Sequence, residues 1–291
     1  MWAGRGMLTF VAVTAVTVAA TLAAGPAHAD TKKPATGANV PAIRLPADVV
    51  DRLKSGDDAR VKSALDDVRM TGKGGVSAVP VIVGLLEQGL PLPLTQAAID
   101  TLGDTESAGA SDVLAVYARH RVVAVRKAAV SALSKTRGPA AVKALRAALS
   151  DPEASVRGTA ATALGGLKAH EALGDLFRAL DRGMAEAAVS IGELCTAEEC
   201  EKLTSKLGTV PLDVVTSGLD EVLFRPPSEV PDDLKVKFVE RVRDVGTGPA
   251  NAFLKQVQAR LRTGSTNVKQ AVDAAVAATN LSPGAHGGEP Q

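Results

Sequence analysis

Residues 125–133 read VRKAAVSAL, and residues 156–164, 31 positions later, read VRGTAATAL. The same step of 31 residues separates Leu102, Leu133 and Leu164. Self-similarity with this period is typical of stacked helical hairpins, because one hairpin cannot bury its apolar face alone. We therefore predict an all-α, right-handed α-solenoid of about six to seven antiparallel helical hairpins, in which the three leucines occupy equivalent interior positions.

The composition favours helices over strands. Aromatic residues make up 2% of the chain, and no stretch alternates apolar and polar residues as a half-buried strand would. Alanine, valine and leucine must fill the interior, and alanine is the strongest helix former. Gly103 and Gly165-Gly166 each follow a helical pattern, so we expect these glycines to end their helices.

The two ends of the chain differ from the repeats. Residues 1–29 combine Arg5, an apolar run and Ala27-His28-Ala29, which together predict a secretory signal peptide cleaved after Ala29. An uncleaved membrane anchor is the alternative. Polar residues, Gly and Pro dominate residues 30–44 and 282–291, so we expect a disordered linker over 30–44 and a disordered tail over 282–291. Between them we expect a solenoid over 45–281, with regular repeats over 94–207 and irregular helices over 211–280.

The fifth hairpin is shorter than the fourth. Leu149 and Ala160 are 11 residues apart, whereas their counterparts Leu180 and Ala187 are 7 residues apart. We expect the four missing residues to come from the turn between hairpins, where the preceding repeat has Asp151-Pro152.

The repeat pattern resembles that of HEAT repeats, in particular the short bacterial type also found in phycobilisome lyases. The resemblance is carried by AAVSAL at 128–133 and DPEASVRGTAATALG at 151–165. In that family the Asp of the turn and the Arg after Val form a structural ladder between repeats. The resemblance thus implies a ladder of Arg126, Asp151 and Arg157, interrupted in the second repeat by Thr95. It also implies a binding scaffold, since most members of the family are scaffolds.

Cys195 and Cys200 are the two cysteines of the chain. Thr196 and Glu199 form a capping-box pattern, which places the cysteines at the N′ and N4 positions of a hydrophobic staple. An even number of cysteines in an exported protein favours a disulfide between them. Two buried free thiols that act as the staple are the alternative. The pair suits neither zinc, which needs more ligands, nor a C-x-x-C redox motif.

Charge is distributed unevenly. No acidic residue lies between Arg119 and Ser150, whereas five glutamates and no basic residue lie between Gly183 and Glu201. We predict a basic patch on the third hairpin that binds another protein with an acidic surface or an anionic envelope component. A merely solvated helix surface is the alternative. The patch comprises Arg119, Arg121, Lys127, Lys143 and Arg146.

Nothing in the sequence indicates catalysis. His120 and His170 fall in different hairpins, and neither a nucleophile nor a phosphate-binding loop accompanies them. The balanced charge and the lack of aromatic residues argue against nucleic-acid binding. We therefore expect a monomeric, non-enzymatic scaffold in the periplasm or outside the cell, without cofactor, metal or membrane span, which binds through the concave ridge of its second helices. The alternative is a lyase-like or enzyme-accessory protein that cradles a small ligand.

Overall fold

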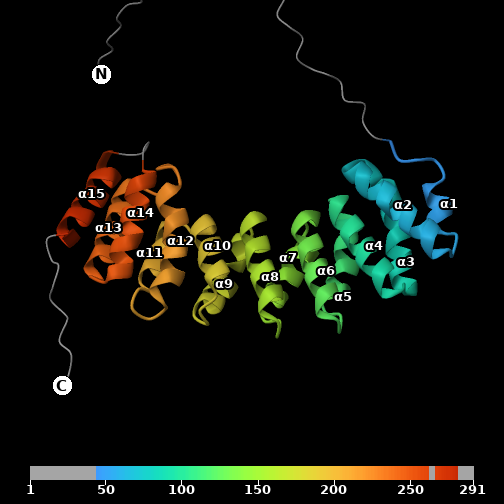
Figure 1. Ribbon diagram of the computed structural model, residues 1–291, viewed down its shortest axis with the longest axis horizontal. Coiled ribbons are helices and arrows are strands. Elements are labelled where there is room, and N and C mark those ends of the chain that lie inside the picture. The colour runs from blue at the N-terminus through green and yellow to red at the C-terminus, as the bar shows by residue number, and fades with distance from the viewer. Residues whose placement is uncertain (1–43, 262–265, 281–291) are drawn as a thin grey trace, which may run out of the picture. The chain divides into compact units, whose positions relative to one another are not determined.

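The computed structural model describes residues 44–261 and 266–280. Within these ranges all regular elements are helices, apart from an isolated bridge between Leu207 and Val210. A short helix α1 (Val49–Leu53) precedes seven helical pairs (Figure 1). The pairs are α2 (Asp58–Thr71) with α3 (Val79–Gln88), α4 (Leu92–Asp104) with α5 (Ser111–Tyr117), α6 (Val123–Thr136) with α7 (Pro139–Ala148), α8 (Ala154–Gly166) with α9 (Leu173–Leu180), α10 (Ala185–Leu194) with α11 (Ala197–Thr204), α12 (Leu212–Phe224) with α13 (Asp232–Asp244), and α14 (Gly248–Arg260) with α15 (Thr266–Asn280).

The pairs stack in chain order. The first helices α2, α4, α6, α8, α10, α12 and α14 each contact the next, and α3, α5 and α7 make a second row behind them. Short 3-10 segments over 72–78, 108–110 and 170–172 lead into α3, α5 and α9. The prediction of an all-α solenoid is confirmed.

The 31-residue period is a spatial period. Leu102 in α4, Leu133 in α6 and Leu164 in α8 all have no exposed surface. They belong to one continuous core that consists mainly of alanine, valine and leucine. The three leucines therefore occupy the interior positions that the repeat predicts.

The glycines expected to end helices have another role. Gly103 is followed by a further helical residue, and a Cβ atom on it would lie 2.9 Å from the Cβ of Ala132 in α6. Gly165 is likewise within α8, where a Cβ would lie 2.8 Å from the Ser190 hydroxyl of α10. As predicted, α4 ends one residue after Gly103 and α8 ends at Gly166, and Gly103 and Gly165 also permit close contact between successive first helices.

The shortened hairpin loses three residues from its first helix and one from the turn. The turn from α7 to α8 spans 149–153 and the turn from α9 to α10 spans 181–184, so the second turn is shorter by one residue. Helix α10 also starts about one turn later relative to the core. The expected deletion of all four residues in the turn was therefore wrong, and the first turn of α8 lacks a full-length neighbour.

The predicted signal peptide over 1–29, the linker up to residue 43 and the tail over 282–291 lie outside the described residues. Among the helices of 44–261 and 266–280, none has the length and apolarity that a bilayer crossing needs.

Candidate functional site

Three of the predicted basic residues surround one groove between α5 and α7. Its volume is about 740 Å³. Arg119, Arg121 and Lys143 line it and are exposed, and they form no ion pair with any residue in the described ranges. We call this feature the cationic groove. Its lining is Asp112, Ala115, Val116, Arg119, His120, Arg121, Ala140, Lys143 and Ala144.

The cationic groove has an apolar floor as well as a charged rim. Alanines from α5 and α7 keep the floor shallow, and Val116 is 69% exposed within it. Asp112 supplies the one carboxylate of the lining. The groove can therefore accept both apolar contact and negative charge.

The turn that carries Arg119 and Arg121 is held in place by Arg126 of α6. One guanidinium nitrogen of Arg126 donates to the carbonyl of His120 at 3.1 Å and to that of Arg121 at 3.4 Å. The backbone N–H of Val122 donates to His120 Nδ1 at 3.2 Å. The turn therefore has a defined conformation even though its cationic side chains face solvent.

Arg126 also forms the expected ladder contact. Its Nε and Nη2 donate to the two carboxylate oxygens of Asp151 at 2.8 and 2.9 Å, in a bidentate pair that is largely buried. Burial alone would raise the pKa of Asp151, but hydrogen bonds from Arg126 and from the Glu153 backbone outweigh it and lower this pKa. Asp151 is therefore held ionised between the third and fourth pairs.

The structure separates the other predicted patch residues from the cationic groove. Arg146 is engaged with Asp175 of α9 at 2.5 Å, so its charge connects α7 to α9. Lys127 lines a different surface with residues of α8 and α10. The helical geometry therefore divides the five predicted residues between two surfaces and uses Arg146 for an inter-repeat contact. That they bind a partner stays a prediction.

Arg157 does not extend the ladder. Its Nη1 donates to the carbonyls of Asp151 at 2.8 Å and Pro152 at 2.9 Å, as Arg126 does one repeat earlier. Within the described residues Arg157 forms no ion pair. Asp151 follows Arg126 by 25 positions, and the residue that follows Arg157 by 25 positions is Arg182. This spacing could have revealed Arg182 in the sequence, but only once the Arg126–Asp151 contact was known.

Thr95 takes over part of the arginine's role in the second repeat. It is buried, and its hydroxyl donates to the carbonyls of Leu90 at 3.0 Å and Pro91 at 3.2 Å. The shorter side chain thus satisfies the turn at the start of α4 but cannot reach the next repeat.

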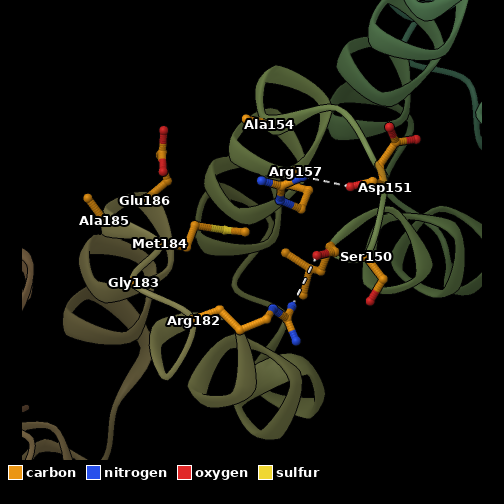
Figure 2. A pocket seen from close by; sticks show the side chains of 10 residues that line it. Ser150, Asp151, Ala154, Arg157, Arg182, Gly183, Met184, Ala185 and Glu186 are labelled. Atoms are coloured by element: carbon orange, nitrogen blue, oxygen red, sulfur yellow. Dashed lines mark hydrogen bonds between the residues drawn. The ribbon is translucent and has the colours of Figure 1, made fainter. Parts of the chain in front are cut away.

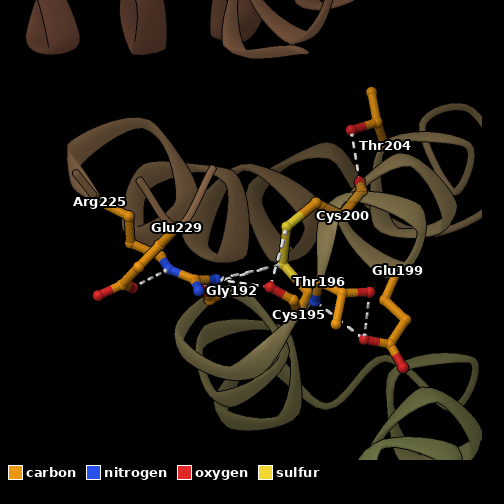
Figure 3. The surroundings of a disulfide bond; sticks show 8 residues. All are labelled: Gly192, Cys195, Thr196, Glu199, Cys200, Thr204, Arg225 and Glu229. Atoms are coloured by element: carbon orange, nitrogen blue, oxygen red, sulfur yellow. Dashed lines mark hydrogen bonds and ion pairs between the residues drawn. A yellow bond between two sulfur atoms is a disulfide. The ribbon is translucent and has the colours of Figure 1, made fainter. Parts of the chain in front are cut away.

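Cys195 and Cys200 form a disulfide, and both are fully buried (Figure 3). Thr196 and Glu199 form the capping box at the start of α11. Arg225, at the end of α12, donates to the carbonyl of Cys195 at 2.8 Å and thereby covers the bridge. The cysteines therefore hold the tight turn between α10 and α11, where the sequence pattern places them.

Two glutamates of the acidic segment lie against glycines of α8. A Cβ on Gly158 would lie 2.8 Å from a Glu186 carboxylate oxygen, and one on Gly165 would lie 2.6 Å from Glu193.

Among the residues that the structure describes, no group of three or more His, Cys, Asp or Glu side chains is arranged to hold a metal ion.

A family model agrees with the repeat architecture. Residues 79–165 match the family model described as HEAT repeats. No curated protein matches the chain. Among solved structures, the complex of CpcE and CpcF of phycocyanin lyase from Nostoc sp. PCC7120 is 18% identical, with 79% of this chain and 93% of that chain covered and a TM-score of 0.41. An engineered protein is 18% identical, with 81% and 68% covered and a TM-score of 0.44. Human deoxyhypusine hydroxylase is 19% identical, with 80% and 95% covered and a TM-score of 0.35.

The match over residues 79–165 covers helices α3 to α8, where the pairs repeat every 31 residues with equivalent buried leucines. Residues 79–165 of this chain are HEAT repeats.

Proposed function

We propose that this protein is a non-enzymatic interaction scaffold that binds an acidic segment of a partner protein in the cationic groove between α5 and α7. The observation that carries the proposal is the grouping of Arg119, Arg121 and Lys143 around one surface, each without an ion pair in the described part of the chain. Cations that a fold does not use for its own contacts are available to a partner.

The shape of the cationic groove supports an extended partner segment. Its floor is mainly alanine, and the exposed Val116 offers an apolar contact beside the three cations. An acidic peptide with an occasional aliphatic residue satisfies both features. HEAT repeats generally mediate protein interactions, and the second helices α5 and α7 supply this surface.

We also place this activity outside the cytoplasm, in the periplasm or beyond it. The sequence of residues 1–29 supports export, and a buried disulfide is typical of proteins that fold in an oxidising compartment. Fractionation of cells and the mass of the mature protein test this part; an intact protein that begins at Met1 in the cytoplasm would contradict it.

The binding proposal is tested with a fluorescein-labelled peptide of alternating Glu and Ser with one central Leu, followed by anisotropy. The groove variant carries Arg119→Glu and Lys143→Glu. Its matched control carries Lys127→Glu and Lys237→Glu, which make the same change of charge at exposed positions outside the groove. We expect the groove variant to lose about tenfold or more in affinity and the control to lose less.

Salt provides the second readout. Because exposed charges are screened over a Debye length of about 10 Å at 0.1 M salt, peptide binding should weaken as salt rises in the wild type and depend little on salt in the groove variant. Equal affinities of wild type and groove variant would refute the cationic groove as the binding surface.

A further inference from the structure

A second cavity lies one repeat beyond the Arg126–Asp151 pair, between α8 and α10 (Figure 2). It occupies the place equivalent to a smaller cavity beside Arg126 and Asp151. The smaller cavity has a volume of about 360 Å³, and the one between α8 and α10 has about 640 Å³. The difference follows from the late start of α10 and from the identity of one residue.

That residue is Arg182, which stands where the ladder requires an acid. Arg126 and Asp151 are 25 positions apart, and Arg157 and Arg182 are also 25 apart. Asp151 accepts two hydrogen bonds from Arg126, whereas Arg182 offers only donors. Asp151 and Glu186 also line the cavity, but the Asp151 carboxylate is paired with Arg126, and neither acid forms an ion pair with Arg157 or Arg182 within the described residues.

Both arginines are held by backbone carbonyls. Arg157 Nη1 donates to the carbonyls of Asp151 and Pro152, at 2.8 and 2.9 Å, and Arg182 Nη2 donates to that of Leu149 at 3.2 Å. Figure 2 shows the two side chains entering the cavity from opposite sides. Their remaining N–H groups have no protein acceptor among the described residues.

We propose that this cavity binds a carboxylate, which completes the interrupted ladder in place of the missing acidic side chain. Arginine forks match the planar geometry of a carboxylate and bind it bidentately. Because Arg126 neutralises Asp151, the two arginines and Glu186, which lies against Gly158, leave the site with a single net positive charge, which favours a monoanion over a doubly charged phosphate. Met184 gives the cavity an apolar wall for the methylene groups of a ligand.

The ligand is either a free small carboxylate or the acidic side chain of a bound protein segment. This inference does not depend on the cationic groove, since it concerns other residues in another part of the stack. The groove variant with Arg119→Glu and Lys143→Glu should bind the carboxylate as the wild type does, so the two proposals fail separately.

The test follows the Nε–Hε resonances of the arginine side chains by NMR in the intact protein, with Arg157 assigned through Arg157→Lys. Sodium acetate, an acetylated and amidated Gly-Glu-Gly peptide, and inorganic phosphate are titrated against sodium chloride at equal ionic strength. We expect saturable shifts of Arg157 and Arg182 with both carboxylates. About equal affinities identify a site for free carboxylates, and about tenfold tighter peptide binding identifies an acidic side chain as the source.

The decisive variant is Arg182→Asp, which restores the ladder of the preceding repeat. It should abolish the acetate-dependent shift of Arg157 and raise the midpoint of thermal unfolding, because an internal carboxylate then occupies the site. Lys237→Asp is the matched control, with the same change of charge at an exposed position on α13. It should leave acetate binding unchanged.

Three results would overturn the proposal: shifts as large in chloride as in acetate, tighter binding of phosphate than of acetate, or unchanged acetate binding in Arg182→Asp. Because Arg182 is exposed, its substitution should preserve the helical circular dichroism signal. If Arg182→Asp lowers that signal, Arg157→Gln replaces it as the variant that must lose acetate binding.

Discussion

At the contact between α10 and α12, we predict that replacing a glycine by alanine lowers the stability of the protein. Helix propensity alone would predict an increase. The two helices pack backbone against backbone at Gly192 and Gly218, in adjacent positions of the stack (Figure 1). A Cβ atom on Gly218 would lie 2.4 Å from the carbonyl oxygen of Ala188, and one on Gly192 would lie 2.2 Å from the carbonyl oxygen of Gly218. We therefore expect Gly218→Ala to destabilise the protein.

The magnitude follows from the overlap. Ordinary van der Waals contact begins at 3.4 Å, so a methyl group at Gly218 requires the helices to separate by about 1 Å. Replacing glycine by alanine in a helix stabilises by about 0.5–1 kcal/mol where space is available. Overpacking of an interface costs about 1–3 kcal/mol. Since a backbone carbonyl cannot rotate away as a side chain can, we place Gly218→Ala toward the upper part of that range, despite its propensity gain.

Gly84→Ala is the matched control. Gly84 lies inside α3, and a Cβ atom on it would meet nothing within 4 Å. This variant should be unchanged or more stable than the wild type by up to about 1 kcal/mol.

The assay is urea unfolding followed by circular dichroism at the helical signal, combined with hydrogen exchange of the amides in α10 and α12. Gly218→Ala should lower the unfolding midpoint and increase exchange first in these two helices. If Gly218→Ala and Gly84→Ala shift the midpoint in the same, stabilising direction, the close backbone contact would be wrong.

Three further outcomes follow from the described contacts. Leu133→Ala removes a fully buried side chain from the repeat seam and should cost about 2–5 kcal/mol in urea unfolding; a loss below about 0.5 kcal/mol would contradict its burial. Reduction of Cys195–Cys200 should cost about 2 kcal/mol, because the bridge closes a short loop; thiol counting with and without reductant verifies the bond. Because the pKa of Asp151 is lowered in the folded protein, its stabilising contribution is present above its unfolded pKa and is lost as pH falls through the folded pKa. At neutral pH the wild type should therefore unfold at a higher temperature than Asp151→Asn, and this difference should disappear as the pH is lowered. A difference that stays constant from neutral to acidic pH would exclude the link between Asp151 ionisation and stability.

The architecture can be predicted from the amino-acid sequence, because helical periodicity is a local property that depends on which residues are apolar. The 31-residue step identified the buried positions of Leu102, Leu133 and Leu164, and the capping-box pattern placed the two cysteines on either side of one turn. Each of these conclusions depends on residues that are close in sequence or repeated at one fixed spacing.

Which charged side chains the fold uses for its own contacts depends on how the helices pack in three dimensions. Arg146 and Lys143 look alike on one helical face in the sequence, yet Asp175 lies 2.5 Å from Arg146, whereas Lys143 forms no ion pair among the described residues. The site of the four-residue deletion was also undetermined, because the separation of Leu180 from Ala187 gives only the combined length of turn and helix. Contacts between repeats depend on how neighbouring pairs stack, so the meeting of Arg157 and Arg182 at one cavity emerges in three dimensions.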